Sequence, residues 1–252
     1  MIKTFADAEQ LNRFAAEKFV EIARASINSN EENFTVALSG GSTPKSLYQL
    51  LASDEYKNKV DWSKIFFFFG DERNVLPDDA ESNFLMANEN LFTTLEISDK
   101  NIIRWQTEFK NAEITAVNYE LTISKFYEDN NKSIVTMNDC DCPRFDLILL
   151  GMGADGHTAS LFPFTEALNE TEKITAANRV EKFDTTRLTL TFPVINNARN
   201  VIFLVKGADK AEALYEVLEG NFQPEKYPAQ AVKPVEGNLL WLIDTEAARL
   251  LK

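Results

Sequence analysis

The sequence predicts an α/β protein with a mostly parallel sheet covered by helices on both faces. Short, almost unbroken apolar runs alternate along the chain with stretches of helical periodicity, which is the pattern of parallel strands buried between helices. Glycine-rich turns follow the apolar runs at 34–39 and 145–150. The chain has 252 residues, which suits one large α/β domain or two small ones. Because no repeat and no clear linker appears, we expect a single domain over residues 1–252.

In the first half, residues 7–28 are predicted to form a helix, because Leu11, Ala15 and Phe19 recur at helical spacing. Thr43 is the expected N-cap of the next helix, with Pro44 at its first position. The other elements expected here are a buried strand at 34–39, a buried strand at 65–69, a helix at 79–92, a short strand at 102–103, an amphipathic helix at 112–128 and a polar loop at 129–143.

The second half opens with the predicted central strand at 145–150, whose apolar run suits a strand buried on both faces. After Pro163 the sequence becomes rich in threonine, and apolar residues alternate with threonine in a pattern typical of antiparallel or edge strands. The elements expected here are additional strands at 174–177 and 187–192, a buried strand at 201–205, a helix at 211–218, a buried strand at 239–243 and a closing helix at 245–251.

Composition and charge narrow the classes of partner. The net charge of −13 argues against nucleic acid and anionic membranes. No apolar run approaches the ~18–20 residues of a membrane span, and the first residues lack the basic-then-apolar layout of a signal peptide. We therefore expect a cytoplasmic protein. Cys140 and Cys142 are too few for a disulfide framework or a four-ligand zinc site, so we expect reduced thiols in a surface loop.

His157 is the only histidine of the chain, and it lies on the glycine-rich turn that follows the strand at 145–150. Gly151, Gly153 and Gly156 let the backbone turn tightly and approach a ligand closely. Asp155 precedes the histidine by two residues. Because open α/β sheets bind ligands at the carboxyl ends of their strands, we expect His157 to be catalytic.

The same turn also fits the dinucleotide fingerprint G-x-G-x-x-G between Gly151 and Gly156. That fingerprint needs a long helix after the last glycine and an acidic residue about 20 positions on. Glu170 or Glu172 could supply the acid, but Glu172 opens a predicted strand and Pro163 interrupts the helix. The pattern alone is therefore a weak signal for a nucleotide.

Two further strand ends carry candidate binding residues. A glycine-hydroxyl turn follows the strand at 34–39 and leads into a helix start, where free backbone N–H groups favour an anion. Its members are Gly40, Gly41, Ser42 and Thr43. The Walker spacing is missing, so this turn is not a P-loop. The charged residues Asp71, Glu72 and Arg73 directly follow the strand at 65–69. We expect both turns at the functional edge of the sheet.

Four segments together resemble the 6-phosphogluconolactonases, in the same order as in that family. They are 38–51 (LSGGSTPKSLYQLL), 70–83 (GDERNVLPDDAESN), 145–163 (FDLILLGMGADGHTASLFP) and 227–248, which begins YPAQAV and contains LLWLIDTEAA. The resemblance implies a Rossmann-like α/β/α fold, shared with glucosamine-6-phosphate deaminases, with no metal requirement and no redox cofactor. The family usually reads LFPG, whereas Phe164 follows Pro163 here. That difference could reshape the rim of the site.

Two alternatives stay open beside the lactonase. A deaminase of the same fold would carry a glutamate where this chain has Phe162, and an apolar ring cannot shuttle a proton. A non-catalytic, sugar-phosphate-binding regulator would not need a base at His157. Binding of a sugar phosphate without turnover of any lactone would favour the regulator.

The resemblance implies hydrolysis of 6-phospho-D-glucono-1,5-lactone to 6-phospho-D-gluconate by a carboxylic ester hydrolase of the pentose phosphate pathway. An imidazole has an ordinary pKa near 6.5, so His157 can take a proton from the attacking water. Either Asp155 or Asp71 could orient its ring. The amides of Gly151, Gly153 and Gly156 are candidate donors to the oxyanion. No second histidine could serve Ser42 or Ser160, so a serine–histidine triad is not expected.

An anionic substrate needs a locally basic site in this acidic protein. The phosphate-binding candidates are the amides and hydroxyls of Gly40, Gly41, Ser42 and Thr43, together with the cations Arg73, Arg187 and Lys210. Each of these cations lies beside a predicted strand end or helix start, and arginine suits bidentate contact with phosphate oxygens. Lys45 is expected to be an exposed helix residue. The expected partner is thus one sugar-phosphate lactone, bound by a monomer or small homo-oligomer.

Overall fold

The predicted α/β architecture is confirmed by a computed structural model, which describes residues 1–29, 33–109, 111–137 and 140–252. Its main sheet has six strands in the order β1-β11-β10-β7-β2-β3, and all five neighbouring pairs are parallel. The strands are β1 (Ile2–Phe5), β2 (Phe34–Leu38), β3 (Ile65–Phe69), β7 (Leu147–Leu150), β10 (Asn200–Val205) and β11 (Asn238–Asp244).

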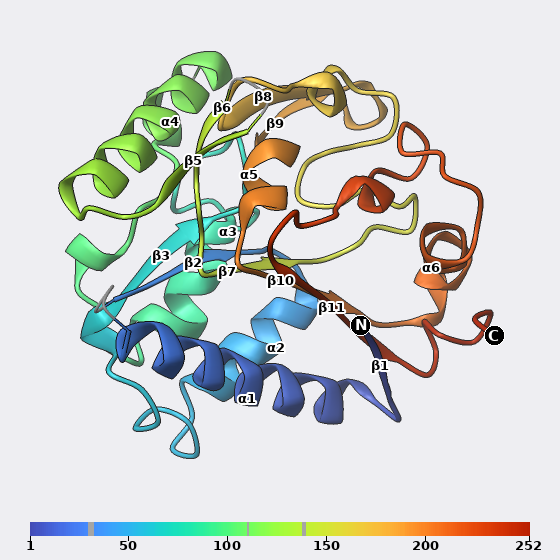
Figure 1. The fold of residues 1–252 in the computed structure, drawn as a ribbon, viewed down its shortest axis with the longest axis horizontal. Helices are drawn as coiled ribbons and strands as arrows, with labels where there is room; N and C mark the ends of the chain where they lie inside the picture. Colours follow the sequence, from blue (N-terminus) through green and yellow to red (C-terminus); the bar gives the residue numbers. More distant parts are fainter. Residues whose placement is uncertain (30–32, 110, 138–139) are drawn as a thin grey trace.

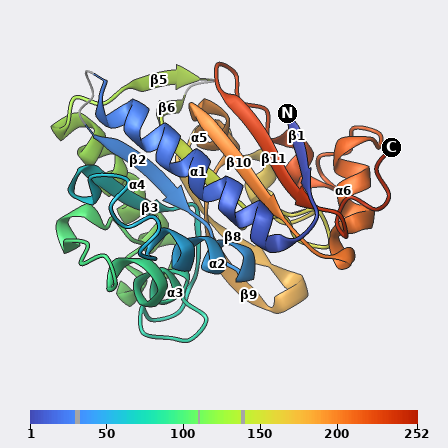
Figure 2. The same ribbon diagram turned by 90° about the horizontal axis from the view of Figure 1, so that it is seen from below.

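Helices cover both faces of this sheet, as predicted. Figure 1 shows α1 and α2 below the sheet and α4 and α5 above it, and Figure 2 shows α1 crossing in front of the strands. The helices are α1 (Ala8–Ile27), α2 (Ser42–Leu51), α3 (Asn83–Ala87), α4 (Ala112–Asp129), α5 (Phe192–Asn197) and α6 (Ala211–Leu218). Among the described residues no helix is long and apolar enough to cross a membrane.

The parallel strands form because their side chains are apolar on both faces. Every residue of β2 and β7 is buried, and the pairing Val36↔Leu147 joins them at the middle of the sheet. Burial on both faces stabilises such a strand by ~1.5–3 kcal/mol for each large apolar side chain. All six strands run the same way, so the segments that follow β2, β3, β7, β10 and β11 emerge at one edge of the sheet.

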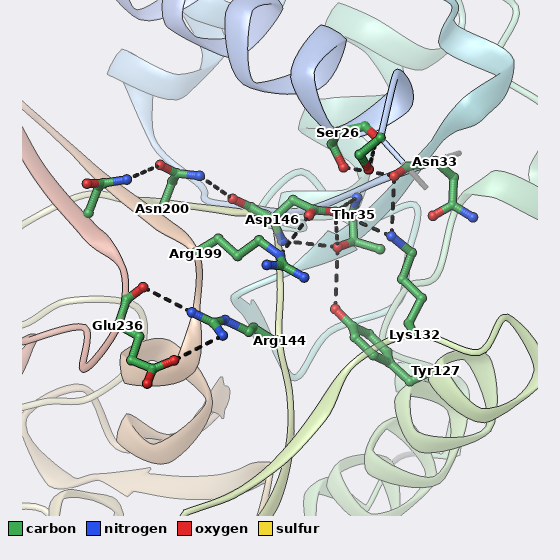
Figure 3. A network of polar contacts seen from close by, with 12 residues as sticks. Ser26, Asn33, Thr35, Tyr127, Lys132, Arg144, Asp146, Arg199, Asn200 and Glu236 are labelled. Carbon is green, nitrogen blue, oxygen red and sulfur yellow. Dashed lines mark hydrogen bonds and ion pairs between the residues drawn. The ribbon is translucent and has the colours of Figure 1, made fainter. Parts of the chain in front are cut away.

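The opposite edge is closed by a buried polar network around Asp146, just before β7 (Figure 3). One carboxylate oxygen accepts hydrogen bonds from the Thr35 N–H at 2.8 Å and its hydroxyl at 2.9 Å, with the Lys132 ammonium 3.5 Å away. The Arg199 guanidinium lies 3.4 Å from the other oxygen. A buried carboxylate is tolerated when it is paired in this way. The network ties β2, β7 and β10 together at their amino ends, away from the edge described below.

The additional strands predicted in the second half are confirmed as an antiparallel sheet. Its strands are β4 (Asp71–Arg73), β9 (Thr185–Leu190) and β8 (Thr175–Val180), in that order. The Leu190 N–H donates to the Gly70 carbonyl at 2.8 Å, which joins this sheet to the end of β3. Residues 71–73, expected as a charged turn at the functional edge of the sheet, form a strand. Register places Arg73 directly opposite Arg187.

The prediction of a polar loop at 129–143 is wrong. It contains a hairpin of β5 (Ile134–Met137) and β6 (Cys140–Pro143), although residues 138–139 lie outside the described residues. Cys140 and Cys142 are fully buried and joined by a disulfide, so the prediction of reduced surface thiols is also wrong. The physical reason is that the hairpin packs against α5, where Asn197 donates to the Cys142 carbonyl at 2.9 Å.

Other local predictions need correction. The N-cap of α2 is Gly41, whose backbone has a φ of 102°. Thr43, which was expected to be the N-cap, is a buried residue inside the helix. The helix expected at 79–92 begins only at Asn83 and continues as a π-helical turn, Asn88–Phe92.

The strand expected at 102–103 is a single bridge between Phe67 and Ile102. Residues 245–250 form turns instead of a closing helix. Strand β1 was not predicted, since most of it is exposed.

Candidate active site

A cavity of about 510 Å³ opens at the edge where the parallel strands end. The segments that follow β2, β3, β7 and β10 contribute to its walls, together with Asp244 at the end of β11, as expected for an open α/β sheet. Ten of the predicted site residues line it: Gly40, Gly41, Ser42, Thr43, Asp71, Arg73, Gly151, Gly153, His157 and Lys210. Asp155, Gly156 and Arg187 were also predicted and lie outside this lining. Lining residues that the prediction missed include Ser39, Lys206, Asp209 and Asp244.

Of the two acids expected near His157, Asp155 is the one whose side chain contacts the imidazole. The Nδ1 atom of His157 lies 2.5 Å from Oδ1 of Asp155. Burial by itself raises the pKa of the Asp155 carboxyl, but the hydrogen bond and charge of His157, with Lys182, hold that pKa below its usual range. The carboxylate can only accept, so Nδ1 carries the proton and Nε2 is left with a free lone pair.

The Gly153 backbone makes room for this pair of side chains. A Cβ atom at residue 153 would lie 2.1 Å from the His157 ring and 2.7 Å from Oδ1 of Asp155. The Gly153 N–H donates to the His157 carbonyl at 2.9 Å and the Gly156 N–H to the Gly153 carbonyl at 3.0 Å, which closes the turn. These two amides are therefore occupied in this structure and not free to bind an oxyanion. No helix follows Gly156, so the dinucleotide fingerprint lacks its structural context.

The flank of His157 is apolar. The Phe162 ring stacks on the imidazole with centroids 4.1 Å apart and an interplanar angle of 25°. This is the residue that occupies the place of the deaminase glutamate in the resemblance noted above. The imidazole thus has one ionised neighbour, Asp155, and one aromatic neighbour.

Asp71 has a different environment from Asp155. Its carboxylate accepts a hydrogen bond from the Ser160 hydroxyl at 2.8 Å, and the Asn83 amide donates to its main-chain carbonyl at 3.0 Å. Within the described part of the chain, no hydrogen bond or ion pair joins Asp71 to His157. Ser160 and Asn83 are buried, and sequence reasoning missed their role, because they lie 89 and 12 positions from Asp71.

The glycine turn after β2 is packed closely against its neighbours. A Cβ atom on Gly40 would lie 1.9 Å from the Asn83 side-chain oxygen, so only glycine fits there without a shift. The Tyr48 hydroxyl accepts from the Ser39 N–H at 3.0 Å and donates to the Ser39 carbonyl at 2.8 Å. These contacts hold the turn so that the first turn of α2 lines the cavity, as an anion site requires.

Cations reach the site from two sides. Arg73 lines the cavity from β4, with Arg187 opposite it on β9. Burial lowers the pKa of Arg187, and the positive charge of Arg73 lowers it further. Among the described residues Arg187 forms no ion pair with a carboxylate. From the other side come Lys206 and Lys210, of which Lys210 pairs with Asp209 at 2.9 Å. Lys45 is exposed and outside the lining, as expected.

Phe164, which stands where the resembling family usually has glycine, adopts a left-handed backbone with φ of 60°. Glycine takes this conformation without strain, whereas a larger residue has to be held there. The Phe164 N–H donates to the Glu225 carbonyl at 3.0 Å, and the ring is 74% exposed. The residue does not line the cavity.

The cavity is lined by an imidazole and by carboxylates, the side chains that serve as acids and bases in catalysis. Among the described residues no group of three or more His, Cys, Asp or Glu side chains is placed to hold a metal ion. The site combines one oriented imidazole, the buried or half-buried carboxylates of Asp71, Asp155 and Asp244, and several cations. Such a set can activate water and hold an anion.

Comparison with known proteins agrees with this geometry. The family of glucosamine-6-phosphate isomerases/6-phosphogluconolactonase matches residues 6–241. A 6-phosphogluconolactonase of Synechocystis sp. is 42% identical over 219 residues, which cover 86% of this chain and 85% of that protein. The solved 6-phosphogluconolactonase of Trypanosoma brucei has a TM-score of 0.87 at 31% identity, covering 100% of this chain and 98% of that one.

A monomeric glucosamine-6-phosphate deaminase has a TM-score of 0.79 at 21% identity, covering 99% of each chain, so it shares the fold. The family match spans most of the chain, and the fold and the oriented histidine agree with it. This protein therefore belongs to the glucosamine-6-phosphate isomerase/6-phosphogluconolactonase family.

Proposed function

We propose that this protein hydrolyses 6-phospho-D-glucono-1,5-lactone to 6-phospho-D-gluconate, with His157 as general base. The observation that carries the proposal is the His157–Asp155 pair at the wall of a cavity that also holds several cations. The similarity to 6-phosphogluconolactonases over most of their length supports the choice of substrate.

The proposed reaction needs no covalent intermediate. A water molecule attacks the lactone carbonyl while Nε2 of His157 removes its proton. The ester bond to the ring oxygen then breaks, and that oxygen takes the proton back from the imidazolium to become a hydroxyl group. The Asp155 carboxylate stabilises the imidazolium between these steps. General base catalysis of this kind contributes roughly 10²–10⁴-fold.

The phosphate is proposed to bind between the first turn of α2 and the Arg73–Arg187 pair. Two guanidinium groups on adjacent strands repel each other, and an anion between them would relieve that repulsion. Lys206 and Lys210 are the alternative cations, but Lys210 already has Asp209 as a partner. The oxyanion is assigned to the amide of Gly151, because those of Gly153 and Gly156 donate within their own turn.

The experiment is to measure acid release from freshly prepared lactone at pH 7. We expect the wild type to accelerate hydrolysis far above buffer and His157→Asn to lose at least about 10²-fold in kcat with its fold intact by circular dichroism. A wild-type rate equal to that of buffer would contradict the proposal. Ammonia release from glucosamine 6-phosphate would instead support the deaminase, and binding without turnover would support the regulator.

The stacked Phe162 ring argues against the deaminase, since it puts an apolar group beside His157 where that reaction needs a carboxylate. The cytoplasmic location and the monomer or small homo-oligomer expected from the sequence stay predictions, as does the expectation that neither nucleic acid nor membrane is a partner.

A further inference from the structure

The tip of the β8–β9 hairpin reaches the His157–Asp155 pair from a distant part of the sequence. The tip is a short 3₁₀ turn, Glu181–Phe183, followed by Asp184 with a left-handed φ of 50°. The Lys182 ammonium lies 3.0 Å from Oδ2 of Asp155. His157 binds the other oxygen, Oδ1, so the imidazole and the ammonium group share one carboxylate without competing for an atom.

A second contact from the same tip reaches Phe162, the ring that flanks the imidazole. The Phe183 ring meets Phe162 edge-to-face, with centroids 5.7 Å apart and an interplanar angle of 77°. Phe162 in turn stacks on His157. Phe183 is 48% exposed, so burial alone does not explain why this ring lies there. The tip thus contacts Asp155 through an ion pair and the ring that flanks His157 through aromatic packing.

We infer that Lys182 is a positioning residue for His157, which acts by binding the Asp155 oxygen that the imidazole leaves free. This inference rests on the proposed function for its catalytic meaning. A carboxylate held at one oxygen can rotate about its terminal torsion, which is broad. The ammonium group on the second oxygen fixes the carboxylate plane and therefore the direction of the imidazole.

The same contact places a positive charge on the far side of the carboxylate that pairs with His157. The Asp155 carboxylate favours the imidazolium, and the Lys182 ammonium opposes it. The other charged groups that line the cavity with His157 are Asp71, Arg73, Lys206, Asp209, Lys210 and Asp244. None of these changes when Lys182 is replaced. Removing the ammonium should therefore make the imidazole easier to protonate, so that it acts as a base only at higher pH.

His157 is the only histidine in the chain, so its imidazole can be titrated by proton NMR without assignment ambiguity. In Lys182→Met, we expect the titration midpoint to rise by about 0.5 pH unit, the effect of one partly solvated charge a few ångströms away. The acid limb of the kcat–pH profile should move by the same amount, and kcat at neutral pH should fall by at most about threefold, the factor that half a pH unit represents. Lys182→Arg keeps the charge and should titrate like the wild type.

Arg179→Met is the matched control, because Arg179 pairs with Asp184 on the same hairpin and no contact joins it to Asp155 among the described residues. It should leave the midpoint unchanged. An unchanged midpoint in Lys182→Met, or an equal shift in Arg179→Met, would overturn the inference. The NMR titration needs no substrate. If the wild type failed to hydrolyse the lactone, the proposed function would fall while the coupling of Lys182 to His157 would still be decided.

Discussion

Asp155 determines what His157 can do. An ionised carboxylate only accepts hydrogen bonds, so its contact with Nδ1 places the imidazole proton there and leaves Nε2 able to take another. The contact also selects one ring orientation. A neutral amide of the same shape would lose both effects, because it offers a donor as well as an acceptor and so accepts either tautomer.

We therefore expect Asp155→Asn to lower kcat by about 10²- to 10⁴-fold with a much smaller change in KM. The measurement is the lactone hydrolysis assay at pH 7, with Asp78→Asn as a control on an exposed carboxylate outside the cavity. A loss below tenfold would mean that the protein orients His157 by other contacts.

Asp155 should also contribute to stability in a pH-dependent way. Its pKa is lowered in the folded protein, so the contribution is complete above the ordinary carboxyl pKa of ~3.9 and is lost as the pH falls toward the folded value. Between pH 5 and pH 3 the wild type should lose about 1 kcal/mol of unfolding free energy relative to Asp155→Asn. Urea unfolding of both proteins measures this difference, and parallel curves would contradict the ion pair.

Glu72 joins two elements that frame the site. One of its oxygens accepts from the Arg73 N–H at 2.7 Å and the Asn83 N–H at 2.8 Å, and the other from the Ser82 hydroxyl at 3.1 Å and the Phe84 N–H at 2.9 Å. The carboxylate thus anchors β4 to the start of α3. That anchor brings Asn83 to Asp71 and Gly40.

Glu72→Gln should therefore be more disruptive than an isosteric change suggests. Whichever way the amide is turned, its NH₂ group faces an N–H donor, so at least one buried donor loses its acceptor. We expect a loss of about 2–3 kcal/mol in unfolding free energy, measured by urea unfolding. Glu89→Gln changes an exposed carboxylate just after α3 and should cost almost nothing. Similar stability of the two variants would show that Glu72 is not an anchor.

The elements that the sequence predicted well are those whose residues are apolar because they are buried. Strands β2, β3, β7 and β10 are short apolar runs, and tertiary contacts only reinforce that local signal. Strand β4 was missed because its three residues are charged, and it pairs only through β9. The hairpin of β5 and β6 was missed because polar residues surround two buried cysteines. The closing helix failed because, in this described segment, only the Ala248 N–H makes a helical bond, to the Asp244 carbonyl, and the next bond, from Leu251 to Ala248, spans three residues as in a turn.

The same division applies to the site. His157 and Asp155 were found because they are two residues apart on a glycine turn, where sequence spacing and spatial distance coincide. Asn83, Ser160 and Lys182 contact the predicted residues only after the chain folds, and no local pattern marks them. A buried asparagine or serine near a predicted strand end is the only signal available, and it is too common to be specific.

At the scale of the whole molecule, an acidic protein places several cations at one edge of its sheet. The net charge is −13, so an anionic substrate is repelled at long range, but salt screens that repulsion beyond about 8–10 Å. Close contacts then decide binding. The parallel sheet brings the ends of several strands to one place, and the antiparallel sheet adds Arg187 behind Arg73.

If this pair holds the phosphate, Arg187→Ala should raise KM for the phosphorylated lactone by about 10- to 100-fold, the worth of one charge-assisted hydrogen bond. The unphosphorylated lactone should keep its kcat/KM within about twofold, because the chemistry at His157 is untouched. Arg73 is a poorer probe, since its guanidinium also donates to the Glu81 carbonyl and so supports the loop. Lys45→Ala removes an equal charge from an exposed position on α2 and should affect neither substrate. Equal losses on both lactones in Arg187→Ala would assign this arginine to the fold or to the chemistry, and the phosphate would have to bind at Lys206 and Lys210 instead.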